Sequence, residues 1–137
     1  MDFGIRDKVA LVTASSRGLG RGCAEQLAAD GCRVAICSRK TNAAKQAAEE
    51  IATQTGADVL GFGADMRQIV DINNLVKAVQ QSLGDPEILV TNAGGPPPGN
   101  YASTAIEEYD KALNLTLMSA VRLIHAVTPA MQAKRWG

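Results

Sequence analysis

Short apolar runs alternate along this chain with longer stretches in which apolar residues recur every three or four positions. The short runs predict strands at 8–13, 33–37, 58–62 and 87–91. The stretches between them predict helices at 18–30, 41–54 and 69–83. Such alternation is typical of βαβ units built around a parallel sheet.

The third of these helices has the clearest apolar stripe along one face. It consists of Ile69, Ile72, Leu75, Val76, Val79 and Leu83, and the sequence Gly-Asp-Pro at 84–86 ends the pattern. Thr41 is expected to cap the second helix, because a hydroxyl can accept a hydrogen bond from the first turn. Gly31 and Gly56 are expected to end the first two helices in a left-handed conformation.

The segment after the fourth strand predicts a loop followed by a long helix. Asn92, Ala93, Gly94 and Gly95 are followed by three prolines at 96–98, which favour an extended loop. Thr104 and Glu107 have capping-box spacing, and they predict one long helix that continues to about Lys134 and bends at Pro129.

Right-handed crossovers between these elements give the strand order 3-2-1-4. In a sheet of this order the ligand crevice lies between the first and fourth strands, at their carboxyl ends. The sequence therefore predicts an α/β fold, a Rossmann-like doubly wound parallel sheet, as a single dinucleotide-binding domain over residues 1–137.

Composition and charge exclude several other classes. The formal net charge is zero, so the chain lacks the positive charge that nucleic-acid binding requires. No apolar run approaches the roughly 18 residues that span a bilayer, and no signal-peptide pattern begins the chain. The three cysteines, Cys23, Cys32 and Cys37, are odd in number and without CxxC spacing, which argues against a disulfide framework or a zinc site. We expect a cytoplasmic protein with no membrane or nucleic-acid partner and no bound metal.

The turn after the first strand is suited to a phosphate. Residues 13–20 read Thr-Ala-Ser-Ser-Arg-Gly-Leu-Gly and lead directly from a strand into a helix. Small residues let backbone amides approach an anion, and the helix directs the positive end of its dipole toward it.

With these residues placed, the chain resembles the short-chain dehydrogenase/reductase family, particularly its 3-oxoacyl-[acyl-carrier-protein] reductases. The turn is similar to the family's Thr-Gly-x-x-x-Gly-x-Gly motif, with Ala14 in place of the first glycine. Asp65-Met66 resembles the family's pair at the adenine, and Asn92-Ala93-Gly94 matches its Asn-Ala-Gly. The cofactor-binding residues predicted in this way are Thr13, Ser15, Ser16, Arg17, Gly18, Leu19, Gly20, Ser38, Arg39, Asp65, Met66, Asn92, Ala93 and Gly94.

Charge at the end of the second strand favours NADP over NAD. Enzymes that use NAD usually place a carboxylate there, whereas this chain has Ser38 and Arg39. Arg39 and Arg17 could hold the 2′-phosphate from two directions. The alternative is that Arg39 and its neighbour Lys40 are ordinary solvated residues.

The resemblance implies a catalytic Tyr-x-x-x-Lys pair that these residues do not contain. The residues four positions after Tyr101 and Tyr109 are Ala105 and Leu113. We therefore expect the domain to be incomplete at its C-terminus, truncated before strand five, and inactive alone.

A family asparagine on the long helix is represented here by Thr116, by register from Tyr109. Thr116 is thus the one catalytic candidate. The alternative is that Thr116 is a packing residue and that nearby Asn114 is a polar surface residue.

Three hypotheses remain open. The chain could be the cofactor-binding portion of an NADP-dependent reductase of a carbonyl substrate, or the corresponding alcohol, with a 3-oxoacyl thioester as one option. It could instead be a non-catalytic dinucleotide-binding module, or a segment that folds only by association. The resemblance also implies a homo-oligomer, because the long helix of this family commonly packs at a subunit interface.

Overall fold

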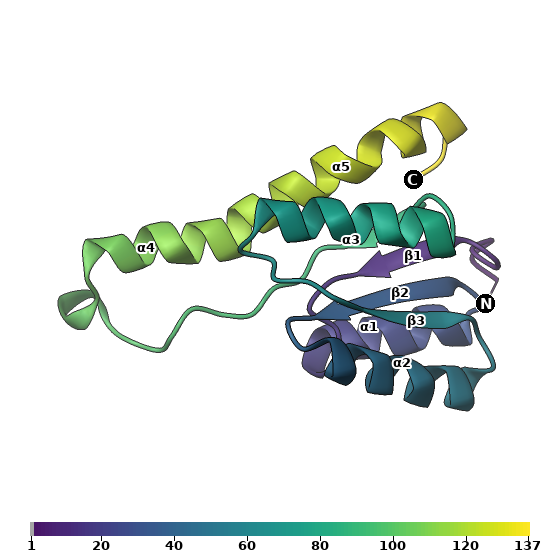
Figure 1. The fold of residues 1–137 in the computed structure, drawn as a ribbon, viewed down its shortest axis with the longest axis horizontal. Helices are drawn as coiled ribbons and strands as arrows, with labels where there is room; N and C mark the ends of the chain where they lie inside the picture. Colours follow the sequence, from purple (N-terminus) through teal and green to yellow (C-terminus); the bar gives the residue numbers. More distant parts are fainter. Residues whose placement is uncertain (1) are drawn as a thin grey trace.

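The computed structural model describes residues 2–137 and shows a parallel sheet of four strands in the order β3-β2-β1-β4 (Figure 1). The strands are β1 (Val9–Val12), β2 (Arg33–Ser38), β3 (Val59–Gly63) and β4 (Ile88–Val90). The helices before the last strand are α1 (Gly18–Ala29), α2 (Thr41–Thr55) and α3 (Ile69–Ser82). The predicted fold class and strand order are confirmed, and the predicted bounds of these elements hold to within one residue.

Helices cover both faces of the sheet. In Figure 1, α1 and α2 lie on one side of the strands and α3 and α5 (Ser119–Lys134) lie on the other. Successive residues of β1 alternate between two hydrophobic clusters, with Leu11 against α3 and α5 and Val12 against α1 and α2. Both faces of β1 are buried, which explains why it is an uninterrupted apolar run.

Close packing of α2 on the sheet depends on small residues. A side-chain carbon built at Gly61 of β3 would lie 2.3 Å from the backbone oxygen of Ala44 in α2. Ala44, Ala47 and Ala48 form much of the buried face of this helix. The alanine-rich sequence of α2 therefore serves its close approach to β3.

Two predicted caps are absent. The residue before α2 is Lys40, and Thr41 lies inside the first turn without capping it. The hydroxyl of Thr104 donates to the backbone oxygen of Asn100, so Thr104 and Glu107 form no capping box. The capping box in this region joins Asn100 and Ser103 around a short 3-10 helix, η1 (Tyr101–Ser103).

The structure tests two other predictions about the helices, the buried stripe of α3 and the left-handed ends of α1 and α2. Ile69, assigned to the buried stripe of α3, is 51% exposed, while the other members of the stripe are buried. Ile69 is the first residue of the helix and lies beyond the edge of the core. Gly31 and Gly56 have φ angles of +89° and +72°, which confirms the left-handed helix ends.

The long C-terminal helix has three consecutive parts: α4 (Ile106–Leu113), a π-helical segment η2 (Asn114–Met118) and α5. Pro129 lies within α5, which is continuous through it. The departure from α-helical geometry falls at η2 rather than at the proline predicted to bend the helix. A π segment carries one extra residue in its turn and changes which side chains face the sheet.

The α4 end of this helix and the preceding loop extend beyond the sheet (Figure 1). Among residues 2–137, no helix combines the length and the apolar composition needed to cross a lipid bilayer.

Candidate functional site

A cleft of about 570 Å³ opens at the carboxyl ends of β1 and β4. Its lining comes from five places in the sequence: the turn after β1, the end of β2, the turn after β3, the segment after β4 and the π-helical segment η2. The lining residues are Ala14, Ser16, Arg17, Gly18, Leu19, Ser38, Arg39, Ala64, Met66, Arg67, Asn92, Ala93, Gly94, Gly95, Pro97 and Leu115. The cleft lies where the strand order predicts a ligand crevice, and its volume suits a small organic ligand.

The floor of the cleft is fixed by hydrogen bonds between the ends of β1 and β4. The hydroxyl of Thr13 donates to the backbone oxygen of Asn92 at 2.6 Å and accepts from the backbone amide of Asn92 at 2.9 Å. The side-chain amide of Asn92 donates to the backbone oxygen of Ala14 at 2.9 Å. Because the two strand ends share three bonds, the turns that follow them are held side by side.

The turn after β1 requires two residues with positive φ. Gly18 has a φ of +62°, which glycine adopts without cost, whereas Ala14 has a φ of +46°. The family pattern has glycine at the position of Ala14, so this chain keeps the backbone conformation and accepts the strain of a methyl group.

Gly20 and Ser15 stabilise the same turn, Gly20 by allowing a close approach and Ser15 by two hydrogen bonds. A side-chain carbon at Gly20 would lie 2.7 Å from the side-chain nitrogen of Asn92 and 2.8 Å from the backbone oxygen of Ala14. The hydroxyl of Ser15 is buried, donates to the backbone oxygen of Val12 at 2.6 Å and accepts from the amide of Cys37 at 3.2 Å. Burial raises the pKa of the Cys37 thiol to about 11, so this thiol stays protonated beneath the turn.

The N-terminus of α1 faces the cleft with free donors. Its first residues, Gly18 and Leu19, line the cleft, and no side chain caps the helix. No acidic residue occupies its first turn. Unpaired amides and the positive end of the helix dipole together favour an anion at this point.

Positive side chains also line the cleft. Arg17 and Arg39 are exposed lining residues, and Ser38 lies beside Arg39 at the end of β2. The hydroxyl of Ser38 accepts from the amide of Lys40 at 3.2 Å and can still donate to a ligand. Among the lining residues there is no carboxylate.

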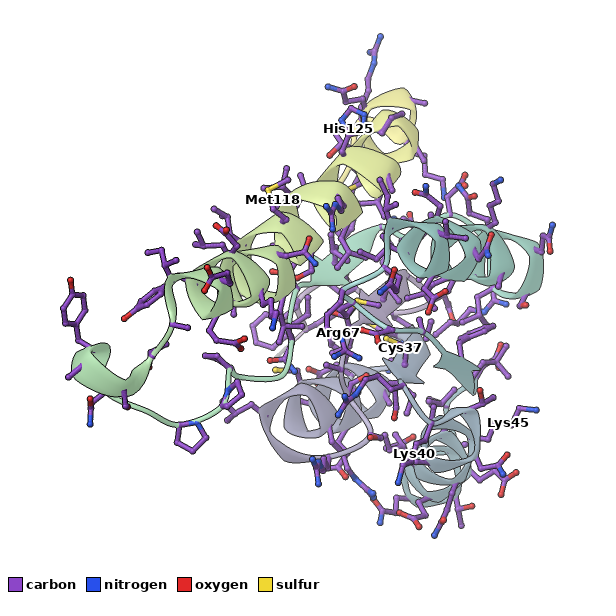
Figure 2. The ribbon with its side chains drawn as sticks, turned by 60° about the vertical axis from the view of Figure 1, so that its left-hand side comes forward. Cys37, Lys40, Lys45, Arg67, Met118 and His125 are labelled. Atoms are coloured by element: carbon purple, nitrogen blue, oxygen red, sulfur yellow. The ribbon has the colours of Figure 1, made fainter. Side chains whose placement is uncertain are left out.

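Arg67 is a lining residue that the sequence analysis missed. Its guanidinium contacts both carboxylate oxygens of Asp65, with Nε at 2.9 and 3.1 Å and Nη2 at 2.5 Å. The hydrogen bonds from Arg67 lower the pKa of Asp65, and the charge of Arg39 adds to this effect. In the view of Figure 2, Arg67 lies between the long helix and the opposite layer of the molecule. Its position two residues after Asp65, a predicted cofactor-binding residue, could have indicated it from the sequence.

The structure divides the predicted cofactor-binding residues into two groups. Those that line the cleft are Ser16, Arg17, Gly18, Leu19, Ser38, Arg39, Met66, Asn92, Ala93 and Gly94. Thr13, Ser15 and Gly20 are buried behind this lining, and Asp65 contacts it through Arg67. These four residues would therefore affect a ligand through the position of the lining residues that they contact.

The predicted catalytic candidate Thr116 lies outside the cleft lining. Its side chain is exposed, and its hydroxyl donates to the backbone oxygen of Ala112 at 2.8 Å. Leu115, the residue before it, lines the cleft. Asn114 is half-buried and bonded on both sides, to the backbone oxygen of Arg67 and to the guanidinium of Arg122.

Comparison with known proteins gives consistent matches. The model of the short chain dehydrogenase family matches residues 8–137. The chain is 34% identical over 130 residues to the 3-oxoacyl-[acyl-carrier-protein] reductase FabG of Escherichia coli, an alignment that covers 95% of this chain and 52% of the relative. It is 33% identical over 135 residues to D-beta-hydroxybutyrate dehydrogenase of Cupriavidus necator, covering 97% of this chain and 51% of that protein.

Among solved structures, L-sorbose reductase from Gluconobacter frateurii, complexed with NADPH and L-sorbose, superposes with a TM-score of 0.92 at 33% identity. That match covers 98% of this chain and 51% of the reductase. The chain thus spans about half the length of the curated relatives it matches.

Proposed function

Because this chain belongs to the short-chain dehydrogenase family, we propose that its cleft binds NADP(H) and that it is the cofactor-binding part of a reductase acting on a carbonyl compound. The observation that carries this proposal is the lining of the cleft, which combines the uncapped amides of α1 with the side chains of Arg17 and Arg39.

The residues of the cleft fit the charges of such a dinucleotide. The amide donors of α1 suit a pyrophosphate, because they are unpaired and no carboxylate lies among the lining residues. Gly20 allows the turn to lie directly against Asn92, which a side chain would prevent. Arg17, Arg39 and the hydroxyl of Ser38 suit the extra phosphate that distinguishes NADP from NAD.

The proposed role of the residues of this chain is to bind the dinucleotide and to orient it. When bound, the nicotinamide supplies or accepts the hydride that interconverts a carbonyl and an alcohol. Thr13 and Asn92 hold the floor, the α1 amides and arginines bind phosphates, and Met66 and Leu115 supply apolar walls. Shape and positive charge thus fix one position for the cofactor.

We propose no proton-transfer group within residues 2–137 other than Thr116. Thr116 occupies the position of the family asparagine by register from Tyr109. In this structure its hydroxyl donates to the backbone oxygen of Ala112. A 3-oxoacyl thioester is a candidate substrate because of the likeness to the FabG reductase. The absence of a Tyr-x-x-x-Lys pair from this sequence favours binding without turnover by these residues alone, so a non-catalytic dinucleotide-binding module is the second candidate.

Self-association is also proposed, on the face of the long helix that points away from the sheet. Leu113, Leu117, Val121 and Ile124 are each about half exposed along this face. Met118 and His125, labelled on this helix in Figure 2, are also exposed. An apolar stripe of this kind is typical of a protein interface. We place the protein in the cytoplasm, because its cysteines at 32 and 37 are buried and unpaired.

The proposal is tested by titrating the chain with NADPH and with NADH, following the fluorescence of the reduced nicotinamide. We expect NADPH to bind at least tenfold more tightly. Tighter binding of NADH would overturn the assignment of the arginines to a 2′-phosphate, and binding of neither would leave association as the remaining hypothesis. Oxidation of NADPH in the presence of a 3-oxoacyl thioester should be absent, and turnover would overturn the proposed inactivity.

A further inference from the structure

One side chain joins two walls of the cleft that are far apart in the sequence. The side-chain amide of Asn114, in η2, donates to the backbone oxygen of Arg67, in the turn after β3, at 3.1 Å. The residues next to these two partners, Leu115 and Met66, line the cleft. The hydrogen bond therefore connects the wall supplied by the long helix to the wall supplied by the sheet.

Asn114 is itself held in place. Its side-chain oxygen accepts from the guanidinium of Arg122, eight residues further along in α5, at 2.9 Å. An amide is required for this arrangement, because one end must donate to a carbonyl while the other accepts from a cation. An aspartate would satisfy Arg122 and would place an acceptor against the carbonyl of Arg67.

The position of Asn114 in the helix matters as well. It is the first residue of the π segment, where the extra residue changes the direction of the side chains that follow. Thr116 is bonded only within the helix, to Ala112, so it does not link the segment to the sheet. Of the two polar side chains in η2, that of Asn114 bonds to the turn after β3 and that of Thr116 bonds within its own helix.

We infer that Asn114 is a positioning residue of the dinucleotide site: by bonding to Arg67 it sets the distance between Leu115 and Met66 and so fixes the width of the adenosine end of the cleft. This inference rests on the proposed function. The adenosine end is identified by Arg39 and Arg67, which line the cleft near Met66. Asn114 touches no cofactor in this account and acts through the two walls that it joins.

The test compares Asn114→Ala, Asn114→Asp and the control Asn74→Ala. Asn74 is an exposed asparagine of α3 for which the described part of the chain shows no side-chain hydrogen bond. The probes are NADPH and adenosine 2′,5′-bisphosphate, which carries only the adenosine end. Loss of one hydrogen bond of ordinary strength corresponds to an affinity about three- to tenfold weaker. We expect that loss for both probes in both Asn114 variants and no change in the control.

Asn114→Asp separates positioning from general stability. It keeps the contact with Arg122, so its melting temperature should stay close to that of the wild type while its affinity falls as in Asn114→Ala. Adding Arg122→Met to Asn114→Ala should weaken binding no further, because both substitutions remove the same link.

The outcomes distinguish the two proposals. A wild-type chain that binds neither probe overturns the proposed function, and this inference with it. A wild type that binds both probes, with Asn114→Asp binding equally well, overturns the inference alone. Loss of affinity in Asn114→Asp only in proportion to a lowered melting temperature would likewise reject positioning in favour of a structural role.

Discussion

The hydroxyl of Thr13 bonds to both backbone groups of Asn92, donating to its oxygen at 2.6 Å and accepting from its amide at 2.9 Å. One side chain thus continues the hydrogen bonding of β1 and β4 past the end of the sheet. The turns that line the cleft begin at these two residues, so their relative position depends on this contact.

Replacing Thr13 by valine should therefore destabilise the fold. The substitution keeps the shape but leaves the amide and oxygen of Asn92 without their partner, at a cost of about 1–3 kcal/mol in the free energy of unfolding. Urea denaturation measures this loss. Thr53→Val is the matched control, since the exposed hydroxyl of Thr53 bonds only within its own helix, and it should change stability by less than about 0.5 kcal/mol. Equal effects of the two substitutions would contradict the role assigned to Thr13.

The conformation of Ala14 predicts a stabilising substitution. Its φ of +46° strains an alanine, and Ala14→Gly should raise the free energy of unfolding by roughly 1 kcal/mol. The control Ala78→Gly, in the middle of α3, should lower it by about 1 kcal/mol, because that alanine is helical. Thermal denaturation of both variants checks the opposite signs, and a loss of stability in Ala14→Gly would refute the strain.

The two glycines of α1 should respond differently to alanine. A methyl group at Gly20 would meet Asn92 and the backbone of Ala14 within 3 Å, whereas one at Gly22 would meet no described atom within 4 Å beyond its chain neighbours and the backbone of its own helix. Gly20→Ala should lose about 1–3 kcal/mol of stability and bind NADPH at least tenfold more weakly. Gly22→Ala should gain up to about 1 kcal/mol through its helix propensity and bind normally. NADPH titration and urea denaturation measure both variants. Equal behaviour of Gly20→Ala and Gly22→Ala would contradict the close contact of Gly20 with Asn92.

Arg39 should determine the preference between cofactors. Arg39→Asp replaces a donor for the 2′-phosphate by a carboxylate, and we expect NADPH to bind about 10- to 100-fold more weakly while NADH changes less than about threefold. Lys40→Asp makes the same change of charge at a residue outside the cleft lining. If Lys40→Asp discriminated as strongly as Arg39→Asp, the effect would be one of overall charge, and Arg39 would be an ordinary solvated residue.

Glu87 gives a prediction for pH. Burial alone would raise the pKa of Glu87, but hydrogen bonds from Lys8 and from the amide of Val9 lower it below 4.5. Lys8 also lies 4.4 Å from the centre of the Trp136 ring. The carboxylate binds its proton more weakly in the folded chain, so its stabilisation is present above pH 4.5 and is lost as the pH falls through the lower folded value.

Glu87→Gln should accordingly lower the free energy of unfolding at pH 7 by about 1 kcal/mol, and the difference from the wild type should disappear on acidification. Thermal denaturation between pH 3 and pH 7 measures it. Glu49→Gln, at an exposed position of α2, is the control and should change little at any pH. A difference that persists unchanged at pH 3 would contradict the assignment.

Local patterns predicted most of the fold and the part of the site that follows the strands directly. The apolar runs and the glycine-rich turn are visible in the sequence because strand burial and phosphate binding require residue types at short spacing. Leu115 was missed because it reaches the cleft only through the packing of the long helix, whereas Arg67, which bonds to Asp65 within one turn, could have been found from the sequence. Thr41 and Thr104 have the right residue type for caps, but Thr41 lies one residue inside α2 and the hydroxyl of Thr104 bonds to the backbone oxygen of Asn100.

The sequence by itself determined a parallel α/β sheet in the order 3-2-1-4 and the turns at the ends of β1 and β4, since these follow from hydrophobic periodicity and the handedness of crossovers. Only the tertiary structure decided which predicted residues face the cleft and which lie beneath it. It also placed Asn114 against Arg67, because a hydrogen bond between residues 47 positions apart depends on how a helix packs on a sheet and leaves no periodic trace in the chain.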